Sequence, residues 1–184
     1  MLEINFNPFP ELSTERLTLR QFTNEDVHEL FVLRSDKKVM QFIPRPLAKT
    51  TDDILQLIQK VNEMISKNEG INWAVTLKND SKVIGMIGYF RMAKEHYRAE
   101  VGYMLHPAYQ GKGIMREALN TVIDYGFSVM KLHSMEAIVD PQNLPSAKLL
   151  ERYGFTKAGF FKEHEFFDGK FFDSFYYTLL TPVK

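Results

Sequence analysis

Hydrophobic and polar positions follow two different periods along this chain, and each change of period marks a new element. Apolar residues recur at helical spacing in four segments, at about 23–35, 51–65, 114–130 and 144–153. Alternating or continuous apolar runs predict strands at 17–20, 72–77, 82–90, 100–105 and 135–139, followed by an aromatic-rich hairpin around 168–169. This order predicts one α/β domain over residues 1–184. Its sheet is mixed and largely antiparallel, with about seven strands and about four helices.

Residues at the ends of the helical segments support the same boundaries. Thr23 and Asp26 form a capping-box pattern before the first segment, and a threonine at 50–51 can cap the second. Pro145 suits the first turn of the last helix, and Gly154 suits its C-terminal cap.

Composition narrows the function classes. The 184 residues are 45% hydrophobic and 25% charged, which is ordinary for a soluble globular protein. The 23 basic and 23 acidic residues give a formal net charge of zero, so we expect no nucleic-acid and no membrane partner. There is no cysteine, and no apolar run approaches the roughly 18 residues of a membrane span. Without a signal pattern, a cytoplasmic location is expected.

The segment 109–119, YQGKGIMREAL, carries the clearest chemical signal. It joins the strand at 101–105 to the 114–130 helix through Gly111 and Gly113. Glycines allow close approach of the backbone, and the first N–H groups of a helix attract negative charge. Lys112 and Arg116 add positive charge beside them. The turn therefore predicts a phosphate or pyrophosphate site.

Other phosphate loops and a zinc site are excluded by spacing. The third glycine of a dinucleotide fingerprint is missing after Gly113, and there is no G-x-x-x-x-G-K-[ST] run. His164-Glu165 lacks the second histidine of the H-E-x-x-H pattern, so no metal is expected.

The turn resembles the acetyl-coenzyme A signature of the GNAT acetyltransferases, Q/R-x-x-G-x-G/A. Gln110, Gly113 and Met115 occupy its fixed places, and Met115 departs from the small residue expected there. The resemblance implies acetyl-CoA as co-substrate. The implied contacts are Met104, Leu105, Gln110, Gly111, Lys112, Gly113, Ile114, Met115, Arg116, Asn143 and Ser146.

Further segments extend this resemblance over about residues 11–180. The run 143–155, ending in Gly-Phe, is similar to the family's second motif, and 14–20 looks like the opening of the RimJ/RimL-type branch. The resemblance implies a GNAT-like single domain of α/β (α+β) class.

Glu100 is the candidate general base. A carboxylate in the middle of a strand is costly to bury without a role, and it can take the proton of an ammonium directly or through water. The alternative is an ion pair with Arg98 or with a cation of a neighbouring strand.

The resemblance also assigns a backbone role to Leu105, with Met104 beside it. In the family this strand splays from its neighbour and frees an N–H for the thioester oxygen. Ser146 is the candidate proton donor to the leaving thiolate, and it and Asn143 can equally serve as helix caps. Leu150 stands where many relatives have a tyrosine acid, and Tyr153 is interpreted as a packing residue.

Two surface features carry further hypotheses. The segment Phe42–Arg45 falls where the family's acceptor pocket has one wall, with Arg45 as a carboxylate ligand or a solvated loop residue. The aromatic hairpin at 160–177 is interpreted as core or as a homodimer face.

The resemblance implies acetyl transfer to a primary amine by direct attack in a ternary complex. RimJ/RimL likeness favours a protein N-terminal α-amine, whose pKa of about 8 demands less of a base than a lysine of about 10.4. An acetyltransferase for a small-molecule amine or antibiotic stays open. A non-catalytic coenzyme A-binding module is the alternative of a different class.

Overall fold

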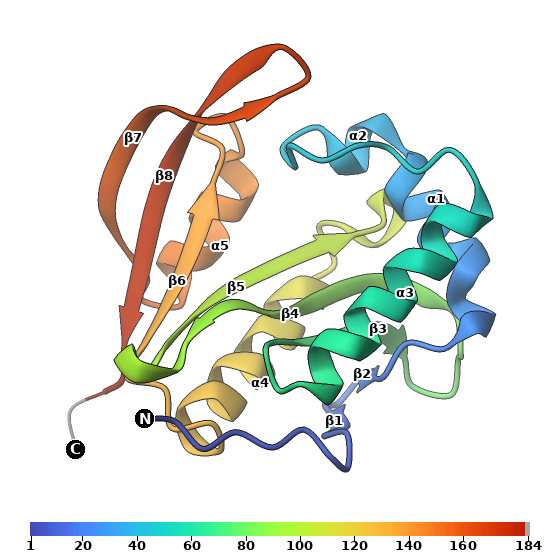
Figure 1. Cartoon of the computed structure of the whole chain (residues 1–184), viewed down its shortest axis with the longest axis horizontal. Coiled ribbons are helices and arrows are strands. Elements are labelled where there is room, and N and C mark those ends of the chain that lie inside the picture. The colour runs from blue at the N-terminus through green and yellow to red at the C-terminus, as the bar shows by residue number, and fades with distance from the viewer. Residues whose placement is uncertain (183–184) are drawn as a thin grey trace.

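An eight-stranded sheet forms the centre of the protein in the order β1-β2-β3-β4-β5-β6-β8-β7 (Figure 1). This computed structural model describes residues 1–182. The strands are β1 (Leu12–Ser13), β2 (Leu17–Arg20), β3 (Ile71–Leu77), β4 (Val83–Ala93), β5 (Arg98–Leu105), β6 (Ser134–Val139), β7 (Thr156–Phe167) and β8 (Lys170–Leu180). Neighbours are antiparallel throughout except for β5 and β6, which are parallel.

Helices cover both faces of this sheet. They are α1 (Val27–Ser35), α2 (Lys37–Met40), α3 (Thr51–Ser66), α4 (Ile114–Ser128) and α5 (Leu144–Arg152), with single 3-10 turns at Asn24–Asp26, Lys94–His96 and Pro107–Tyr109. In Figure 1, α3 lies in front of the sheet and α4 lies behind it. Tyr89 of β4 is fully buried and its hydroxyl donates to the Val122 carbonyl of α4, 2.7 Å away. This hydrogen bond holds α4 against the face of the sheet on which the Tyr89 side chain lies.

The pairing of β5 with β6 is short. Only Arg98–Glu100 pairs with Ser134–Glu136, and the rest of β5 is paired with β4 alone. Beyond Glu136, β6 continues along β8 and carries the hairpin β7–β8 away from β5 (Figure 1). The sheet therefore opens into a V on the side of β5 that faces β6.

The predicted fold class is confirmed, and so are most element boundaries. The capping boxes at Thr23 and Thr50 both form. Asp168 and Gly169 have φ of 48° and 76°, the two positive values that a type I′ turn requires. The structure adds the two-residue β1 and the one-turn α2, both too short to leave a periodic pattern.

The aromatic hairpin is only partly core. Tyr177 is buried, with 1% of its surface exposed, whereas four phenylalanines of the hairpin are exposed: Phe160, Phe161, Phe166 and Phe171. Among residues 1–182, no helix combines the length and the apolar character needed to cross a membrane.

Candidate active site

The turn between β5 and α4 adopts the backbone conformation that its glycines allow. Gly111 and Gly113 have φ of 73° and 75°, in the left-handed region that side chains disfavour. A Cβ built on Gly111 would meet no atom within 4 Å, so this glycine is required by the backbone angle and borders open space.

The N-terminus of α4 is uncapped. Its first internal hydrogen bond runs from the Glu117 N–H to the Gly113 carbonyl at 3.1 Å, and no side chain caps the end. Within residues 1–182, the N–H groups of positions 114–116 therefore have no hydrogen-bond acceptor. The side chains of Ile114 and Met115 are buried. The helix presents free backbone donors and its positive dipole end to an anion.

Arg16 anchors this turn from a segment far away in the sequence. Its guanidinium donates to the Lys112 carbonyl at 3.0 Å and forms an ion pair with Glu117 at 2.7 Å. Sequence reasoning missed this role because Arg16 and Lys112 lie 96 positions apart and leave no local pattern. The family-like opening at 14–20 was the only signal.

Gln110 serves the turn itself. Its Nε2 donates to the Leu105 carbonyl at 3.1 Å, so this signature residue closes the loop between β5 and α4. The implied direct contact of Gln110 with a cofactor stays a prediction, and the hydrogen bond gives it a structural role.

The edge of β5 that faces the V carries unpaired backbone groups. The His106 N–H donates to the Ile84 carbonyl of β4 at 2.8 Å. Because donors alternate in direction along an antiparallel ladder, the Met104 N–H also faces β4, and the Leu105 N–H faces the opposite side. Of the two adjacent residues, Leu105 alone directs its amide into the V.

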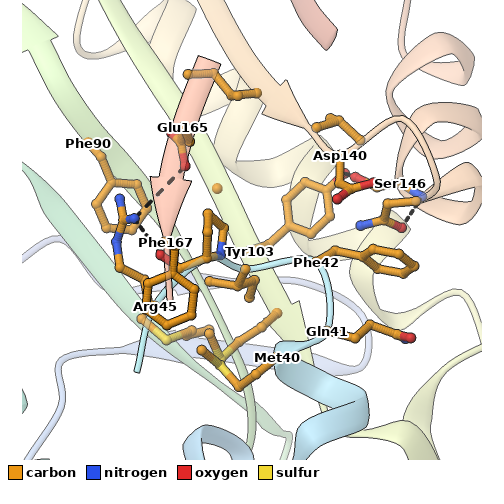
Figure 2. Close-up of a pocket in the computed structure, with 18 of the residues that line it drawn as sticks. Met40, Gln41, Phe42, Arg45, Phe90, Tyr103, Asp140, Ser146, Glu165 and Phe167 are labelled. Carbon is orange, nitrogen blue, oxygen red and sulfur yellow. Dashed lines mark hydrogen bonds and ion pairs between the residues drawn. The ribbon is translucent and has the colours of Figure 1, made fainter. Parts of the chain in front are cut away.

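A cleft of about 1270 Å³ lies at this opening (Figure 2). The α1–α3 segment, α5 and the tip of the β7–β8 hairpin line it, together with residues of the sheet from β4, the β5 stretch Glu100–Met104 and the end of β6. Met40, Phe42, Phe90 and Phe167 give it apolar walls. The expectation that 42–45 lies at the acceptor side is consistent with this lining, since all four residues of that segment contribute to it.

Glu100 lies in the cleft and forms an ion pair with Arg91 of β4, 2.9 Å away. Burial raises the pKa of Glu100 above its ordinary value, and the charge and hydrogen bond of Arg91 act against this rise. The side chain of Arg91 is 53% exposed, and its φ of 42° places it in a strained region at a bulge of β4. The ion-pair alternative is thus realised, with a neighbouring strand's cation as the partner. Arg98 pairs with Glu136 instead, at 3.3 Å.

A second pair of groups bridges the V. The Tyr103 hydroxyl of β5 and the Ser146 hydroxyl of α5 lie 2.8 Å apart. Burial raises the pKa of Tyr103 to about 12, so this phenol keeps its proton at neutral pH. Sequence reasoning missed Tyr103, because nothing in the pattern indicates that it meets a helix 43 residues later.

Residues of α5 next to Ser146 make structural contacts. Asn143 caps α5, since its Oδ1 accepts from the Ser146 N–H at 3.2 Å. Leu150 is fully buried, and the Tyr153 hydroxyl donates to the Arg116 carbonyl at 2.8 Å, which gives Tyr153 a structural contact with α4. In the part of the chain that the structure describes, no group of three or more acidic or histidine side chains is arranged to hold a metal.

Comparison with known proteins agrees with this geometry. Residues 16–156 match the family model of the acetyltransferase (GNAT) domain. The chain belongs to the GNAT acetyltransferase family. A solved GNAT-family acetyltransferase from Bacillus anthracis is 31% identical and superposes with a TM-score of 0.82, over 93% of this chain and 98% of that chain.

Two further relatives carry acceptors in their names. The [ribosomal protein uS5]-alanine N-acetyltransferase of Escherichia coli is 29% identical over 66% of this chain and 63% of its own length. The structure of spermidine N-acetyltransferase from Vibrio cholerae, in complex with CoA and spermine, is 25% identical with a TM-score of 0.80 and covers 91% of this chain and 96% of that chain.

This GNAT protein is therefore an acyltransferase, an N-acetyltransferase that depends on acetyl-CoA. The residues present fit that co-substrate. The uncapped amides of α4 suit its diphosphate, and the opening between β5 and β6 leaves room for an extended arm beside a free strand edge.

The ion pair makes a prediction about Glu100. Because the Arg91 cation favours the carboxylate form, Arg91→Gln should raise the pKa of Glu100 further above its ordinary value. Titration of the Glu100 carboxyl carbon by NMR measures this pKa. Arg98→Gln is the matched control and should change it less, since Arg98 pairs with Glu136. An unchanged or lowered pKa in Arg91→Gln would contradict the prediction.

Proposed function

We propose that this enzyme acetylates an N-terminal α-amine of a protein or peptide, with Glu100 as the base. The observation that carries the proposal is the carboxylate of Glu100, which is partly buried in the cleft next to the open edge of β5. An α-amine of pKa about 8 needs only one modest base. The named acceptor of the ribosomal-protein relative supports this class.

The turn at Gly111–Gly113 and the first amides of α4 are proposed to hold the diphosphate of the co-substrate. Arg16 keeps the turn in place through the Lys112 carbonyl and Glu117. Lys112 and Arg116 add positive charge beside the helix end. When bound, acetyl-CoA supplies an activated acetyl group as a thioester.

The base is proposed to act in exchange with Arg91. An incoming ammonium offers Glu100 a second cation, and the half-exposed Arg91 can move into solvent to make room. Glu100 then takes one proton from the ammonium, directly or through a water molecule, and leaves a neutral nitrogen that can attack the thioester carbonyl. When the C–S bond breaks and the thiolate leaves, the nitrogen loses its second proton to water and becomes the amide. The raised pKa of Glu100 makes its carboxylate a better proton acceptor than an ordinary glutamate.

Charge on the carbonyl oxygen is proposed to be stabilised by the Leu105 N–H. This N–H points into the V, and the carbonyl group of Leu105 accepts a hydrogen bond from Gln110 Nε2 at 3.1 Å. A donor that is already oriented before the reaction needs no reorganisation as the charge develops.

The Tyr103–Ser146 pair is proposed to stabilise the departing sulfur. A thiol has a pKa of about 8.5, below the value of about 12 for Tyr103. Full proton transfer from either hydroxyl is therefore unfavourable. The pair instead donates a hydrogen bond to the sulfur through Ser146, with Tyr103 donating to Ser146 behind it. This refines the expected role of Ser146 as a proton donor.

A small-molecule amine is the second candidate acceptor. The spermidine acetyltransferase relative with spermine in its structure favours this class. Acids in the cleft, among them Asp140 and Glu165, would suit a polyamine.

Replacement of Gly111 tests the cofactor turn. Gly111→Ala should lower stability by about 1 kcal/mol through the left-handed backbone and should weaken CoA binding about tenfold, because its methyl group enters the space of the diphosphate. Gly169→Ala is the matched control variant, because Gly169 also has a positive φ, 76°, and an added Cβ there meets open space, but it lies in the β7–β8 hairpin away from the turn. Calorimetry should find normal CoA affinity there. Equal affinity in both variants would contradict the placement.

The acceptor class is tested by thiol release from acetyl-CoA with N-terminal peptides, a lysine-bearing peptide blocked at its α-amine, and polyamines. We expect α-amine peptides to have the highest kcat/KM. Glu100→Gln should lower kcat by about 100-fold while calorimetry shows unchanged CoA affinity. Preference for polyamines would favour the second candidate, and full activity in Glu100→Gln would exclude Glu100 as the base.

The hydroxyl pair is tested by Ser146→Ala and Tyr103→Phe. We expect Ser146→Ala to lower kcat about tenfold, less than the base variant, because a thiolate is already a fair leaving group. In the double variant, Tyr103→Phe should add little to the loss, since Tyr103 acts through Ser146. Independent, additive losses would show that the two hydroxyls act separately.

A further inference from the structure

Charged side chains in the cleft are sorted by sign onto two walls. The cations of one wall come from the segment α1–α3: Arg34, Lys37, Arg45, Lys49 and Lys60. The acids of the opposite wall come from β5 to β8: Glu100, Asp140, Glu165, Asp168 and Asp173. Glu165 joins the walls through Arg45 at 3.9 Å (Figure 2). The exception to the sorting is Arg91 of β4, which lies among the acids, 2.9 Å from Glu100 and 3.6 Å from Glu165. An occupant of the cleft therefore meets opposite charge on its two sides.

Arg34 differs from the other cations of this wall in its burial, since Lys37, Arg45, Lys49 and Lys60 are exposed. It lies in the last turn of α1, is half-buried, and lines the cleft. Across residues 1–182 its guanidinium has neither an ion-pair nor a hydrogen-bond partner. Burial lowers the pKa of Arg34, and the nearby charge of Arg45 lowers it further. The negative end of the α1 dipole offsets part of this charge but supplies no acceptor to the guanidinium.

In the part of the chain that the structure describes, the exposed Arg116 and Arg152 also have no ion pair, whereas the other two half-buried arginines, Arg20 and Arg98, are paired. Arg16, Arg20 and Arg98 each form an ion pair with a carboxylate, at 2.7, 2.7 and 3.3 Å. A half-buried guanidinium without a partner has lost part of its hydration and gained no acceptor in exchange, which costs free energy. A carboxylate is the group that matches its planar fork with two parallel hydrogen bonds.

We propose that the acceptor carries a carboxylate as well as its amine, and that Arg34 binds this carboxylate while the amine lies at Glu100. The inference rests on the proposed α-amine function and narrows it. The chemical class is an acidic N-terminal peptide, whose carboxylate is a side chain, or a free amino acid, whose carboxylate is its own. Either ligand places each of its charges against the wall of opposite sign.

The same sorting disfavours a polyamine. A second ammonium on a chain that starts at Glu100 and extends across the cleft would approach Arg34 and Lys60. Like charges in a partly buried site repel more strongly than in water. The cationic wall thus discriminates between the two acceptor classes that the relatives represent.

The experiment compares peptides that differ by one charge. Tetrapeptides with an N-terminal alanine, amidated at the C-terminus, carry aspartate or its neutral isostere asparagine at the second or third position. Free alanine and alaninamide form a second pair that tests the main-chain carboxylate, and spermidine is the cationic reference. Turnover of acetyl-CoA gives kcat/KM for each acceptor with wild type, Arg34→Met, Arg34→Lys and the control Lys38→Met. Lys38 is an exposed neighbour that does not line the cleft.

We expect wild type to prefer the acidic member of one pair by at least about tenfold, the value of a charge-assisted hydrogen bond. Arg34→Met should abolish this preference, because kcat/KM for the acidic member falls to that of the neutral member. Arg34→Lys should keep part of it, since it keeps the charge but loses the fork. Lys38→Met should behave as wild type. Which pair shows the preference identifies the source of the carboxylate.

Three results would overturn the inference, and they are distinguishable. Equal turnover of acidic and neutral α-amines by wild type refutes it alone and leaves the proposed function standing. A preference that survives in Arg34→Met assigns carboxylate binding elsewhere. Turnover of spermidine without turnover of any α-amine refutes the proposed function together with the inference. The wild-type comparison decides even if a variant fails to fold.

Discussion

The divergence of β5 from β6 is the constraint on which the rest of the structure depends. Only three residue pairs join these strands, so two halves of one sheet share a short seam and then separate. Every chemical group of the site borders the resulting V: the Leu105 amide on one arm, the Tyr103–Ser146 bridge across it, and the α4 turn at the end of β5. A longer β5–β6 ladder would pair the Leu105 amide and fill the space that a thioester needs.

Contacts distant in sequence hold this opening in shape. Arg16 fixes the turn at Lys112 from the N-terminal segment, and Tyr153 of the α5 end reaches the Arg116 carbonyl of α4. Glu165 connects the hairpin to Arg45 and Arg91 on the other side of the cleft. The turn can therefore leave its helix amides free, because the residues around it, not a cap on the helix, keep it in place.

The sequence allowed the fold and the phosphate turn to be predicted because both depend on local rules. Thr50 caps its helix within three residues, and Gly111 and Gly113 are needed where the backbone turns left-handed. The partners of the candidate base and of Ser146 could not be predicted. Arg91 reaches Glu100 through an irregular bulge, and Tyr103 meets Ser146 only because the V brings α5 to β5. Periodicity records which face of an element is buried, and it contains no information on which distant side chains meet there.

The contact between Arg91 and Glu100 has a consequence for the end of the catalytic cycle. An amine substrate arrives as a cation and competes with Arg91 for one carboxylate. Acetylation turns that cation into a neutral amide, which can no longer form an ion pair with the carboxylate of Glu100. Once Glu100 has released the proton that it took, Arg91 can return from solvent and pair with the carboxylate again, in place of the product. Re-formation of the Arg91–Glu100 ion pair would thus favour product release after each turnover.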